Sequence, residues 1–390
     1  MNSWPTRAMH SFAKAVPRTK QYSSENALVW NLNLDQIESH GGRVLEKLFV
    51  SPDKLGPSTF GFEPRTVLYS KLRPYLNKVV VADEAGFGTT ELVPLRCDPD
   101  EVHPEYLAYF LRSEDFLRFA TEVVAGAKMP RMVMSEFWKF PVPIPPIAEQ
   151  RRIAKILDQA DALRMKRRDA LRQLDSITQS MFIEMFGDPV ANSKRLPVKP
   201  LCQVSTFENG DRSNNYPSGD DIKDEGILFL STKNIKDGRL DLKKSLYISD
   251  EKFNSLSRGK AKRNDLIITL RGTLGSCCIF DTVQDTAFIN AQLMIIRPGP
   301  ECNSTYLHAL LTSQPAQEKF DHIGRGAAVP QLTSAQMASL QIPIPFLADQ
   351  QVFAVRKKSL DELKSQQEQS MTELNALFAS LQHRAFRGKL

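Results

Sequence analysis

The sequence lacks the features of a membrane protein or of a disulfide-stapled secreted domain. No apolar run approaches the roughly 18 residues that a membrane-spanning helix requires. The five cysteines are odd in number, contain no C-x-x-C pair and have no histidines at zinc-ligand spacing. These absences favour reduced thiols in a soluble cytoplasmic protein.

Motifs for catalysis on DNA are also missing. Adenine methyltransferases hold the flipped base with an Asn/Asp-Pro-Pro-aromatic loop, and the nearest string, Pro145-Pro146-Ile147, lacks both the polar residue and the ring. No G-x-x-x-x-G-K-[ST] phosphate loop occurs. The acidic pairs at 220–221 and 224–225 lack the lysine and strand of a nuclease centre, so no metal site is expected there. A self-contained methyltransferase or nuclease is therefore not expected.

Charge gives no strong indication of a partner. The net charge is +6, and no segment of the chain is strongly basic. A nucleic-acid function must therefore rest on local clusters of cations rather than on the overall charge.

The sequence does contain an internal repeat at an offset of 200 residues. Residues 140–150 (FPVPIPPIAEQ) recur as residues 340–350 (LQIPIPFLADQ). Tyr106 and Phe186 also coincide with Tyr306 and Phe386 at this offset, without a gap. We expect two copies of one module, and an N-terminus that begins a domain rather than a removable targeting segment.

Each module divides at its proline-rich strap. Short β-rich runs, turn residues and one short helix predict a globular α+β domain over residues 1–145 and again over 190–345. Residues 147–186 and 347–386 contain neither glycine nor proline, which predicts long helices within 146–189 and 346–390. The predicted fold class is therefore α+β, with two repeated globular domains separated by two long helices.

Apolar residues follow one another along both helices at steps of three and four. This spacing predicts a narrow coiled-coil seam, whereas a helix lying on its own domain would need a wider apolar face. At about 60 Å each, the helices are also too long to cover one small domain. We expect them to pack on each other through a seam of Ile156, Leu163, Leu174, Ile177, Leu360, Leu363, Leu374, Leu377 and Leu381.

Two similar domains on a spacer suit a target with two recognition points. DNA is one such target, because equivalent groove faces recur about 34–36 Å apart, and two copies of a partner protein are another. Such a chain can bind both DNA and two copies of a partner protein. Clusters that interleave cations, amides and aromatic rings favour DNA over solvated loops. They contain Lys71, Arg73, Tyr75 and Lys78; Lys128 and Arg131; Lys233 and Asn234; a basic run at 258–264; and Arg271, Arg325 and Gln331.

The doubled pattern of "KLRPY", "TELVPLR" and "PIPPIAEQRRIAKIL", with a helix that ends in "FGD", resembles the specificity subunit of type I restriction-modification systems. The resemblance covers essentially the whole chain. The second copy departs from the pattern, with Phe346 for the second proline and Gln351-Val352 at the helix entry.

The resemblance implies a non-catalytic DNA reader. Two target recognition domains would each read one half of a bipartite site in double-stranded DNA, and the spacer helices would pair antiparallel as a coiled coil. The subunit would assemble with two copies of a methyltransferase subunit and with restriction subunits in a prokaryotic cytoplasm. S-adenosylmethionine, ATP and Mg would belong to those partners. The alternative is a coiled-coil scaffold that binds proteins only, for which DNA affinity would not fall steeply with salt.

Overall fold

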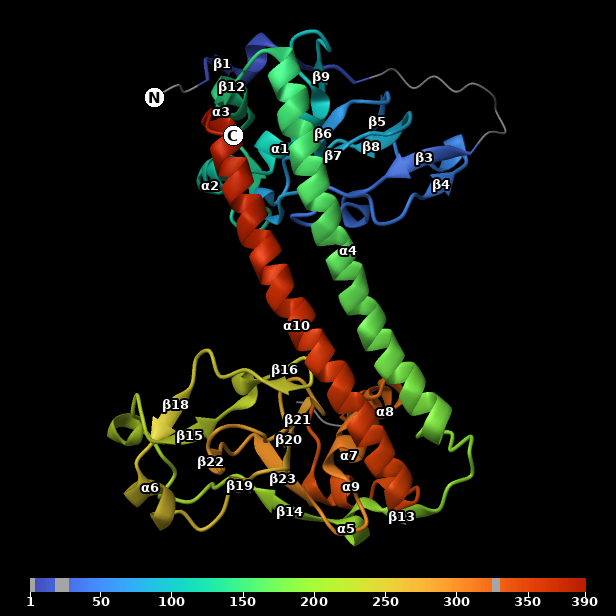
Figure 1. The fold of residues 1–390 in the computed structure, drawn as a ribbon, viewed down its shortest axis with the longest axis vertical. Coiled ribbons are helices and arrows are strands. Elements are labelled where there is room, and N and C mark those ends of the chain that lie inside the picture. The colour runs from blue at the N-terminus through green and yellow to red at the C-terminus, as the bar shows by residue number, and fades with distance from the viewer. Residues whose placement is uncertain (1–3, 18–27, 325–329) are drawn as a thin grey trace. The chain divides into compact units, whose positions relative to one another are not determined.

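The computed structural model describes residues 4–17, 28–324 and 330–390, and the chain forms two compact units. Unit 1 comprises Met1–Asp169 and Gln367–Leu390, and unit 2 comprises Ala170–Gln366. Each unit contains one globular α+β domain and a part of each long helix, α4 (Ile147–Phe186) and α10 (Leu347–Phe386) (Figure 1).

The globular domain of unit 1 contains two four-stranded sheets. The first has the order β2-β9-β6-β7 and is antiparallel throughout. The second has the order β4-β3-β8-β5, in which β3 and β8 are parallel. The strands are β2 (Ala13–Ala15), β3 (Val29–Leu32), β4 (Phe49–Val50), β5 (Thr59–Phe62), β6 (Val67–Ser70), β7 (Val79–Val81), β8 (Gly86–Thr89) and β9 (Leu92–Cys97).

Shorter elements complete this domain. The pair β1 (Thr6–Ala8) and β12 (Pro141–Pro143) joins its two ends, and β10 (Val124–Ala125) pairs with β11 (Arg131–Met132). Its short helices are α1 (Pro104–Leu111), α2 (Glu114–Glu122) and α3 (Met134–Lys139). These helices pack on the first sheet through buried aromatic side chains such as Phe116 and Phe137, which contact Tyr69 of β6.

The globular domain of unit 2 repeats both sheets in the same order, β14-β23-β20-β21 and β18-β15-β22-β19, with β15 and β22 parallel. The strands are β14 (Ser205–Asn209), β15 (Ile227–Leu230), β18 (Leu246–Ile248), β19 (Lys260–Lys262), β20 (Leu266–Thr269), β21 (Cys277–Ile279), β22 (Thr286–Ile289) and β23 (Leu293–Pro298). The shorter elements are β13 (Val198–Pro200) with β24 (Gln341–Pro343), β16 (Ile235–Lys236) with β17 (Arg239–Leu240), α5 (Leu201–Val204), α6 (Asp250–Ser255), α7 (Ser304–Thr312), α8 (Gln314–Gly324) and α9 (Ser334–Ala338).

The strap before each long helix is held by the same buried hydrogen bonds in both units. A fully buried glutamine donates to two backbone carbonyls and accepts from one backbone amide, over 2.8–3.1 Å. A buried tyrosine hydroxyl donates to the carbonyl of the equivalent proline in each strap. These contacts join Gln150 to Glu101, Pro145 and His103, Gln350 to Glu301, Pro345 and Asn303, Tyr106 to Pro143, and Tyr306 to Pro343. Buried polar groups need such partners, which explains why the strap sequence is repeated.

The ends of the long helices are exchanged between the repeats. In unit 1 the ring of Phe386, at the end of α10, packs edge-on against Tyr106 with centroids 5.4 Å apart. In unit 2 the ring of Phe186, at the end of α4, packs against Tyr306 at 4.9 Å. Each globular domain is therefore contacted by the start of its own helix and by the end of the other.

The two helices run antiparallel within each unit, as the resemblance implied. In unit 1 Arg164 donates to Asn375 over 2.9 Å, and its guanidinium lies 4.2 Å from the centroid of the Phe378 ring. In unit 2 Lys364 pairs with Asp175. The α+β fold with repeated globular domains and two long paired helices is confirmed.

The predicted seam is displaced by one residue at four of its nine positions. Leu174 is buried, and Ile156, Leu360, Leu374 and Leu381 are partly buried. Leu163, Ile177, Leu363 and Leu377, however, are 54, 49, 41 and 51% exposed. The next residue along the chain faces the partner helix instead, as Arg164, Lys364 and Phe378 do. Both choices fit a 3-4 spacing, and aliphatic composition alone selected the wrong one.

Candidate nucleic-acid interface

Two of the predicted clusters in unit 1 lie side by side at the end of β6. The amide of Arg73 donates to the carbonyl of Pro130 over 2.7 Å, and the amide of Met132 donates to Lys71 over 2.8 Å. Arg73 has a left-handed backbone (φ 48°) and leads directly into a tight 3-10 turn over Pro74–Leu76. The sequence-distant loops 69–78 and 126–131 therefore form one surface, with Arg73 and Lys128 exposed.

Arg131 does not present a free cation on this surface. Its guanidinium binds the Glu91 carboxylate through both Nε and Nη2, at 2.8–3.1 Å. These hydrogen bonds lower the pKa of Glu91 below its ordinary value. A bidentate pair of this kind is a strong interaction, so any DNA contact by Arg131 must compete with Glu91.

Two other predicted contacts have different places in the fold. Lys78 is partly buried and donates from Nζ to the carbonyl of Leu34 over 2.6 Å, and burial lowers its pKa. Tyr75 is 43% exposed and lies on the surface. Lys71 is partly buried. Lys78 therefore ties a strand to a neighbouring turn, and its assignment as a DNA contact is corrected.

The equivalent surface in unit 2 has the same backbone pairing. The amide of Leu332 donates to Leu270 over 2.9 Å, and Arg271 forms a bridge with Gln331 as Leu72 does with Arg131. The bridge places Arg271 at the position that Leu72 has in unit 1, one residue before the position of Arg73. Arg271 is exposed, and its Nε donates to the side-chain oxygen of Gln331 over 3.2 Å.

A cavity of about 340 Å³ lies beside this pair in unit 2. Two further arginines line it, Arg212 and Arg258, which reach it from the loops that follow β14 and precede β19. Asparagine and glutamine amides complete a lining that is rich in hydrogen-bond donors and cations. The lining residues are Asn209, Gly210, Arg212, Arg258, Leu270, Arg271, Gln331, Leu332, Thr333 and Ser334.

Two carboxylates, one partly buried and one buried, hold the loops that carry these arginines. Glu208 accepts hydrogen bonds from the amides of Gly259 and Lys260 at 2.6 and 2.9 Å. Asp211 is 1% exposed and accepts from the Ser213 amide over 2.6 Å. Burial acts to raise the pKa of Asp211, but hydrogen bonds from Ser213 and Ser257 and the nearby Arg258 bring it below its ordinary value.

A glycine is required where the first of these loops leaves its strand. A Cβ on Gly210 would lie 2.0 Å from the carbonyl oxygen of Asn290, so no other residue fits without moving the backbone. The arginine pocket is therefore fixed by packing and hydrogen bonds in the unliganded protein. Sequence reasoning missed Arg212, although the turn residues Asn209-Gly210-Asp211 directly before it were a usable signal.

The remaining predicted cations that the structure describes in unit 2 do not line this pocket. Arg263 pairs with Asp281 and Asp285, and Lys260 lies 4.8 Å from the ring of Phe253. Lys233 is exposed on another loop, and Arg325 lies outside the described residues.

Asn234 is buried, with an exposed fraction of 4%. Its amide accepts from Ser231 and donates to Asp241, at 2.9 and 3.1 Å. Its assignment as a DNA contact is therefore corrected to a role in forming the turn.

Neither a metal centre nor a membrane span is found where the structure is described. Over residues 4–17, 28–324 and 330–390, no group of three or more His, Cys, Asp or Glu side chains could hold a metal ion. Over the same ranges, no helix combines the length and the apolarity needed to cross a lipid bilayer.

Comparison with known proteins gives a consistent result. A family model described as "Type I restriction modification DNA specificity domain" matches residues 66–173 and 198–375. The chain is 24% identical over 279 residues to the EcoBI specificity subunit of Escherichia coli, covering 64% of this chain and 58% of that protein. It is 23% identical over 276 residues to the MjaVIII specificity subunit of Methanocaldococcus jannaschii, covering 66% and 63%. The matches thus span about three fifths of these relatives.

Solved structures share the fold. The S subunit of a type I system from M. genitalium superposes with a TM-score of 0.60 at 14% identity, covering 98% of this chain and 96% of that one. A chain from a study of complex assembly and conformational transition of the type I R-M system superposes with a TM-score of 0.58 at 17% identity, covering 100% and 99%.

Proposed function

Because the chain belongs to the family of type I restriction-modification DNA specificity domains, we propose that it is a non-catalytic subunit that selects a DNA sequence. Each globular domain reads one half of a bipartite site in double-stranded DNA. The observation that carries this proposal is the duplicated loop pairing at the ends of β6 and β20, which presents cations and amides at the same place in both units. A protein-only scaffold would not need a repeated cationic surface.

The arginine pocket of unit 2 has the chemistry for reading base edges. Arginine pairs with the O6 and N7 atoms of guanine in the major groove, and asparagine or glutamine pairs with adenine. Arg212, Arg258 and Arg271 lie around one cavity with Asn209 and Gln331. Because Glu208 and the buried Asp211 fix the loops, little conformational entropy is lost when DNA binds.

In unit 1, Lys71, Arg73 and Lys128 are the cations that we propose contact DNA. The backbone pairing of the loops is shared with unit 2, but the pairing of the cations differs, because Arg131 is bound to Glu91. We therefore expect the two domains to read different half-sites.

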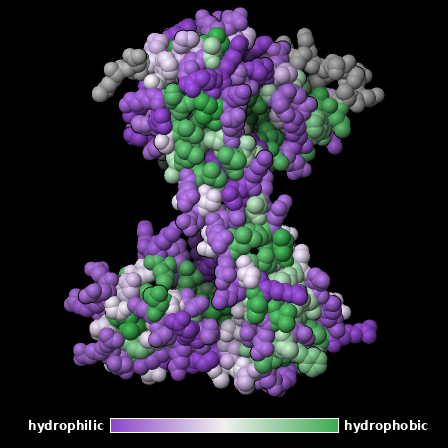
Figure 2. Space-filling model, viewed as in Figure 1, coloured by the Kyte–Doolittle hydropathy of each residue, from purple (hydrophilic) through white to green (hydrophobic). Residues whose placement is uncertain are grey.

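The long helices have two proposed roles. As a spacer, they set the gap between the half-sites. They also bind two methyltransferase subunits, because Leu163 and Leu363, and likewise Ile177 and Leu377, are exposed apolar pairs related by the repeat offset. Figure 2 shows hydrophobic patches on both units within a largely hydrophilic surface. S-adenosylmethionine, ATP and Mg act in the methyltransferase and restriction subunits, in the cytoplasm of a prokaryotic cell.

Sequencing of methylated bases tests this function directly. The chain is co-expressed with its methyltransferase subunit, and genomic methylation is compared with cells that carry the methyltransferase subunit alone. We expect a bipartite motif that depends on this chain. Exchange of residues 1–145 with the corresponding domain of a relative should change one half-site only. Methylation that ignores the exchange, or no motif at all, would refute the proposal.

The scaffold alternative is separated by binding to random duplex DNA. Phosphate contacts make affinity fall steeply as salt rises, whereas a protein-only scaffold gives no measurable salt-dependent binding. Calorimetry with S-adenosylmethionine on the isolated chain should show no stoichiometric binding site.

A further inference from the structure

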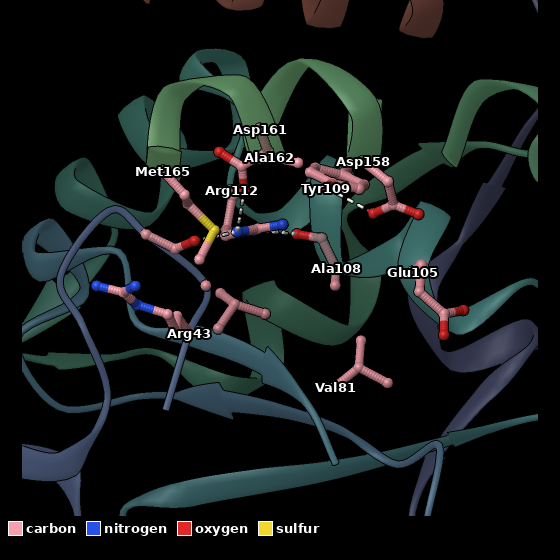
Figure 3. Close-up of a pocket in the computed structure, with 13 residues that line it drawn as sticks. Arg43, Val81, Glu105, Ala108, Tyr109, Arg112, Asp158, Asp161, Ala162 and Met165 are labelled. Atoms are coloured by element: carbon pink, nitrogen blue, oxygen red, sulfur yellow. Dashed lines mark hydrogen bonds and ion pairs between the residues drawn. The ribbon is translucent and has the colours of Figure 1, made fainter. Parts of the chain in front are cut away.

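In unit 1, a loop of the globular domain is fastened to α4 by a charged contact that the DNA surface does not include. Arg112, at the end of α1, donates from Nη1 to the carbonyl of Gly41 over 2.7 Å. The same nitrogen lies 3.8 Å from the carboxylate of Asp161 on α4, which also accepts a hydrogen bond from Arg164 of that helix at 2.8 Å, and the side chains of Arg112 and Asp161 are almost fully buried. Figure 3 shows the Arg112 guanidinium beside Asp161 and pointing into a cavity between α4 and the domain. Arg112 therefore joins the loop and the helix at one point.

The loop leaves space for the Arg112 side chain at Gly42. Gly42 has a φ of 69°, and a Cβ there would lie 1.6 Å from Arg112 Nη1. About two turns further along α4, Arg168 binds Glu38 of the same loop at 2.9 Å. Loop residues 38–43 are thus held against the helix at two points about two turns apart.

Unit 2 carries the same arrangement with different chemistry. Asp361 is the repeat counterpart of Asp161, and it pairs with Arg239 at 3.6 Å. Gly238 has a φ of 75°, and its carbonyl is bound by His308 Nε2 over 2.9 Å. The ion pair is half exposed here, whereas its counterpart in unit 1 is buried.

Each domain is attached to its helix at several points, which in unit 1 include a hydrogen bond from the Tyr109 hydroxyl to Asp158. The first is the buried glutamine of the strap, Gln150 or Gln350. Asp161 and Asp361 lie eleven residues further on, or about 16 Å along the helix. A body held at one point can pivot in any direction, whereas a further contact about 16 Å along the helix leaves rotation only about the line that joins the two points. The cavity of about 260 Å³ beside Arg112 leaves room for such a pivot.

Rotation of a domain on its helix would change the number of base pairs between half-sites that the protein can span. One added base pair moves the second half-site by about 3.4 Å and rotates it by about 35°, because a turn of 10–10.5 base pairs spans about 34–36 Å. Buried ion pairs are weak stabilisers compared with apolar packing, and their best attested use is to fix one geometry. The contact is therefore suited to registration of the domain rather than to stability.

We propose that Asp161 with Arg112, and Asp361 with Arg239, are positioning contacts that fix the length of the gap in the DNA target. The inference rests on the proposed function, because it needs a bipartite site. It assigns gap discrimination to the joints between domains and helices, in addition to the helices themselves.

The test uses the chain in complex with its methyltransferase subunit and duplexes with the wild-type half-sites. The gap is the native one, one base pair shorter, or one base pair longer. The variants are Asp161→Asn, Arg112→Met and the double variant, with Arg118→Gln as a matched control, because Arg118 pairs with Glu114 and Asp115 on the surface. We expect each single variant to lose at least about tenfold of the preference for the native gap, which corresponds to about 1.4 kcal/mol. The double variant should lose no more than either single one.

The outcomes separate the two proposals. A wild-type complex without any bipartite motif refutes the proposed function and the inference with it. A normal wild-type motif, with unchanged gap preference in the variants, refutes only the positioning role, even if the melting temperature falls. Altered half-site sequences would instead make these residues base readers and would also refute it. If Asp161→Asn does not fold, the half-exposed Asp361→Asn carries the test, with a smaller loss expected.

Discussion

The two units share their buried hydrogen bonds but differ in how their charges are balanced. Gln150 and Gln350 make equivalent contacts, and both sheets have the same strand order. On the reading surface, however, Arg131 of unit 1 is bound to a carboxylate, whereas unit 2 has Gln331 at this position, bound by Arg271. Contacts that build the module are thus kept in both copies, and contacts on the reading surface have diverged. Such divergence is expected of a surface that has the proposed role in specificity.

The largest expected effect concerns what the units share. Gln150→Ala and Gln350→Ala each leave two carbonyls and one amide without their buried partner. At about 1–3 kcal/mol for each unsatisfied group, both variants should lose about 3 kcal/mol or more in urea denaturation, and by similar amounts. The exposed Gln173→Ala should lose less than about 0.5 kcal/mol. Very unequal losses would show that the strap contact is not equivalent in the two units.

A pH dependence should distinguish the units. His308 is buried, and burial lowers its pKa to about 4, whereas unit 1 has Ala108 at this position. The unfolded chain binds a proton at this histidine below about pH 6.5 and the folded chain only near pH 4, so stability falls as pH falls through this window. We expect His308 to contribute a loss of about 3 kcal/mol to unit 2 between pH 7.5 and pH 4, in addition to the contribution of His103 in unit 1, whose pKa is also lowered by burial.

The measurement is hydrogen exchange of unit 2 amides against unit 1 amides across this range. His308→Gln should remove the dependence, since the glutamine does not titrate. If both units weaken together in the variant as in the wild type, other groups are responsible.

Base recognition should depend on the arginines of the unit 2 pocket, where the reading surfaces of the two units differ. Arg258→Ala and Arg271→Ala should lose about 1–3 kcal/mol of discrimination at one position of a single half-site. Arg131→Ala should have a smaller effect, because Glu91 already holds that guanidinium. Arg263→Ala, whose partners are Asp281 and Asp285, is the matched control. Competition binding with single-base variants of the target measures these losses, and equal effects from Arg263 would contradict the pocket assignment.

The smallest effect on the isolated chain is expected on the helices. Leu163→Ser and Leu363→Ser alter exposed side chains and should change the free energy of unfolding by less than about 0.5 kcal/mol. The same variants should weaken binding of the methyltransferase subunit in sedimentation experiments. The buried Leu174→Ala should do the reverse, with a loss of stability of about 2–5 kcal/mol. Unchanged assembly in both exposed variants would show that the partner does not cover these positions.

The repeated features of the fold could be predicted from the sequence. Features that depend on which residue of a helix or loop faces its neighbour could not. The prolines, glutamines and tyrosines of the strap have fixed partners, so their spacing of 200 residues showed the fold directly. The seam was placed on Leu163 and Leu377 because aliphatic spacing cannot show that Arg164 packs over an aromatic ring instead. The arginine pocket collects residues from four loops, and only the folded sheets bring Arg212 and Arg258 to Gln331. Asn234 and Lys78 are polar residues whose partners are backbone carbonyls, a role that composition does not reveal.

The exchanged helix ends have an evolutionary consequence. Phe186 closes the domain of one repeat and Phe386 closes that of the other, with equivalent aromatic partners. A half-length ancestor with one domain and one helix would bury the same ring by pairing with a second copy of itself. Duplication and fusion of such a gene would yield the present chain without a new packing contact at these rings. After such a fusion the two reading surfaces would be free to accumulate different substitutions, as Arg131 and Gln331 illustrate.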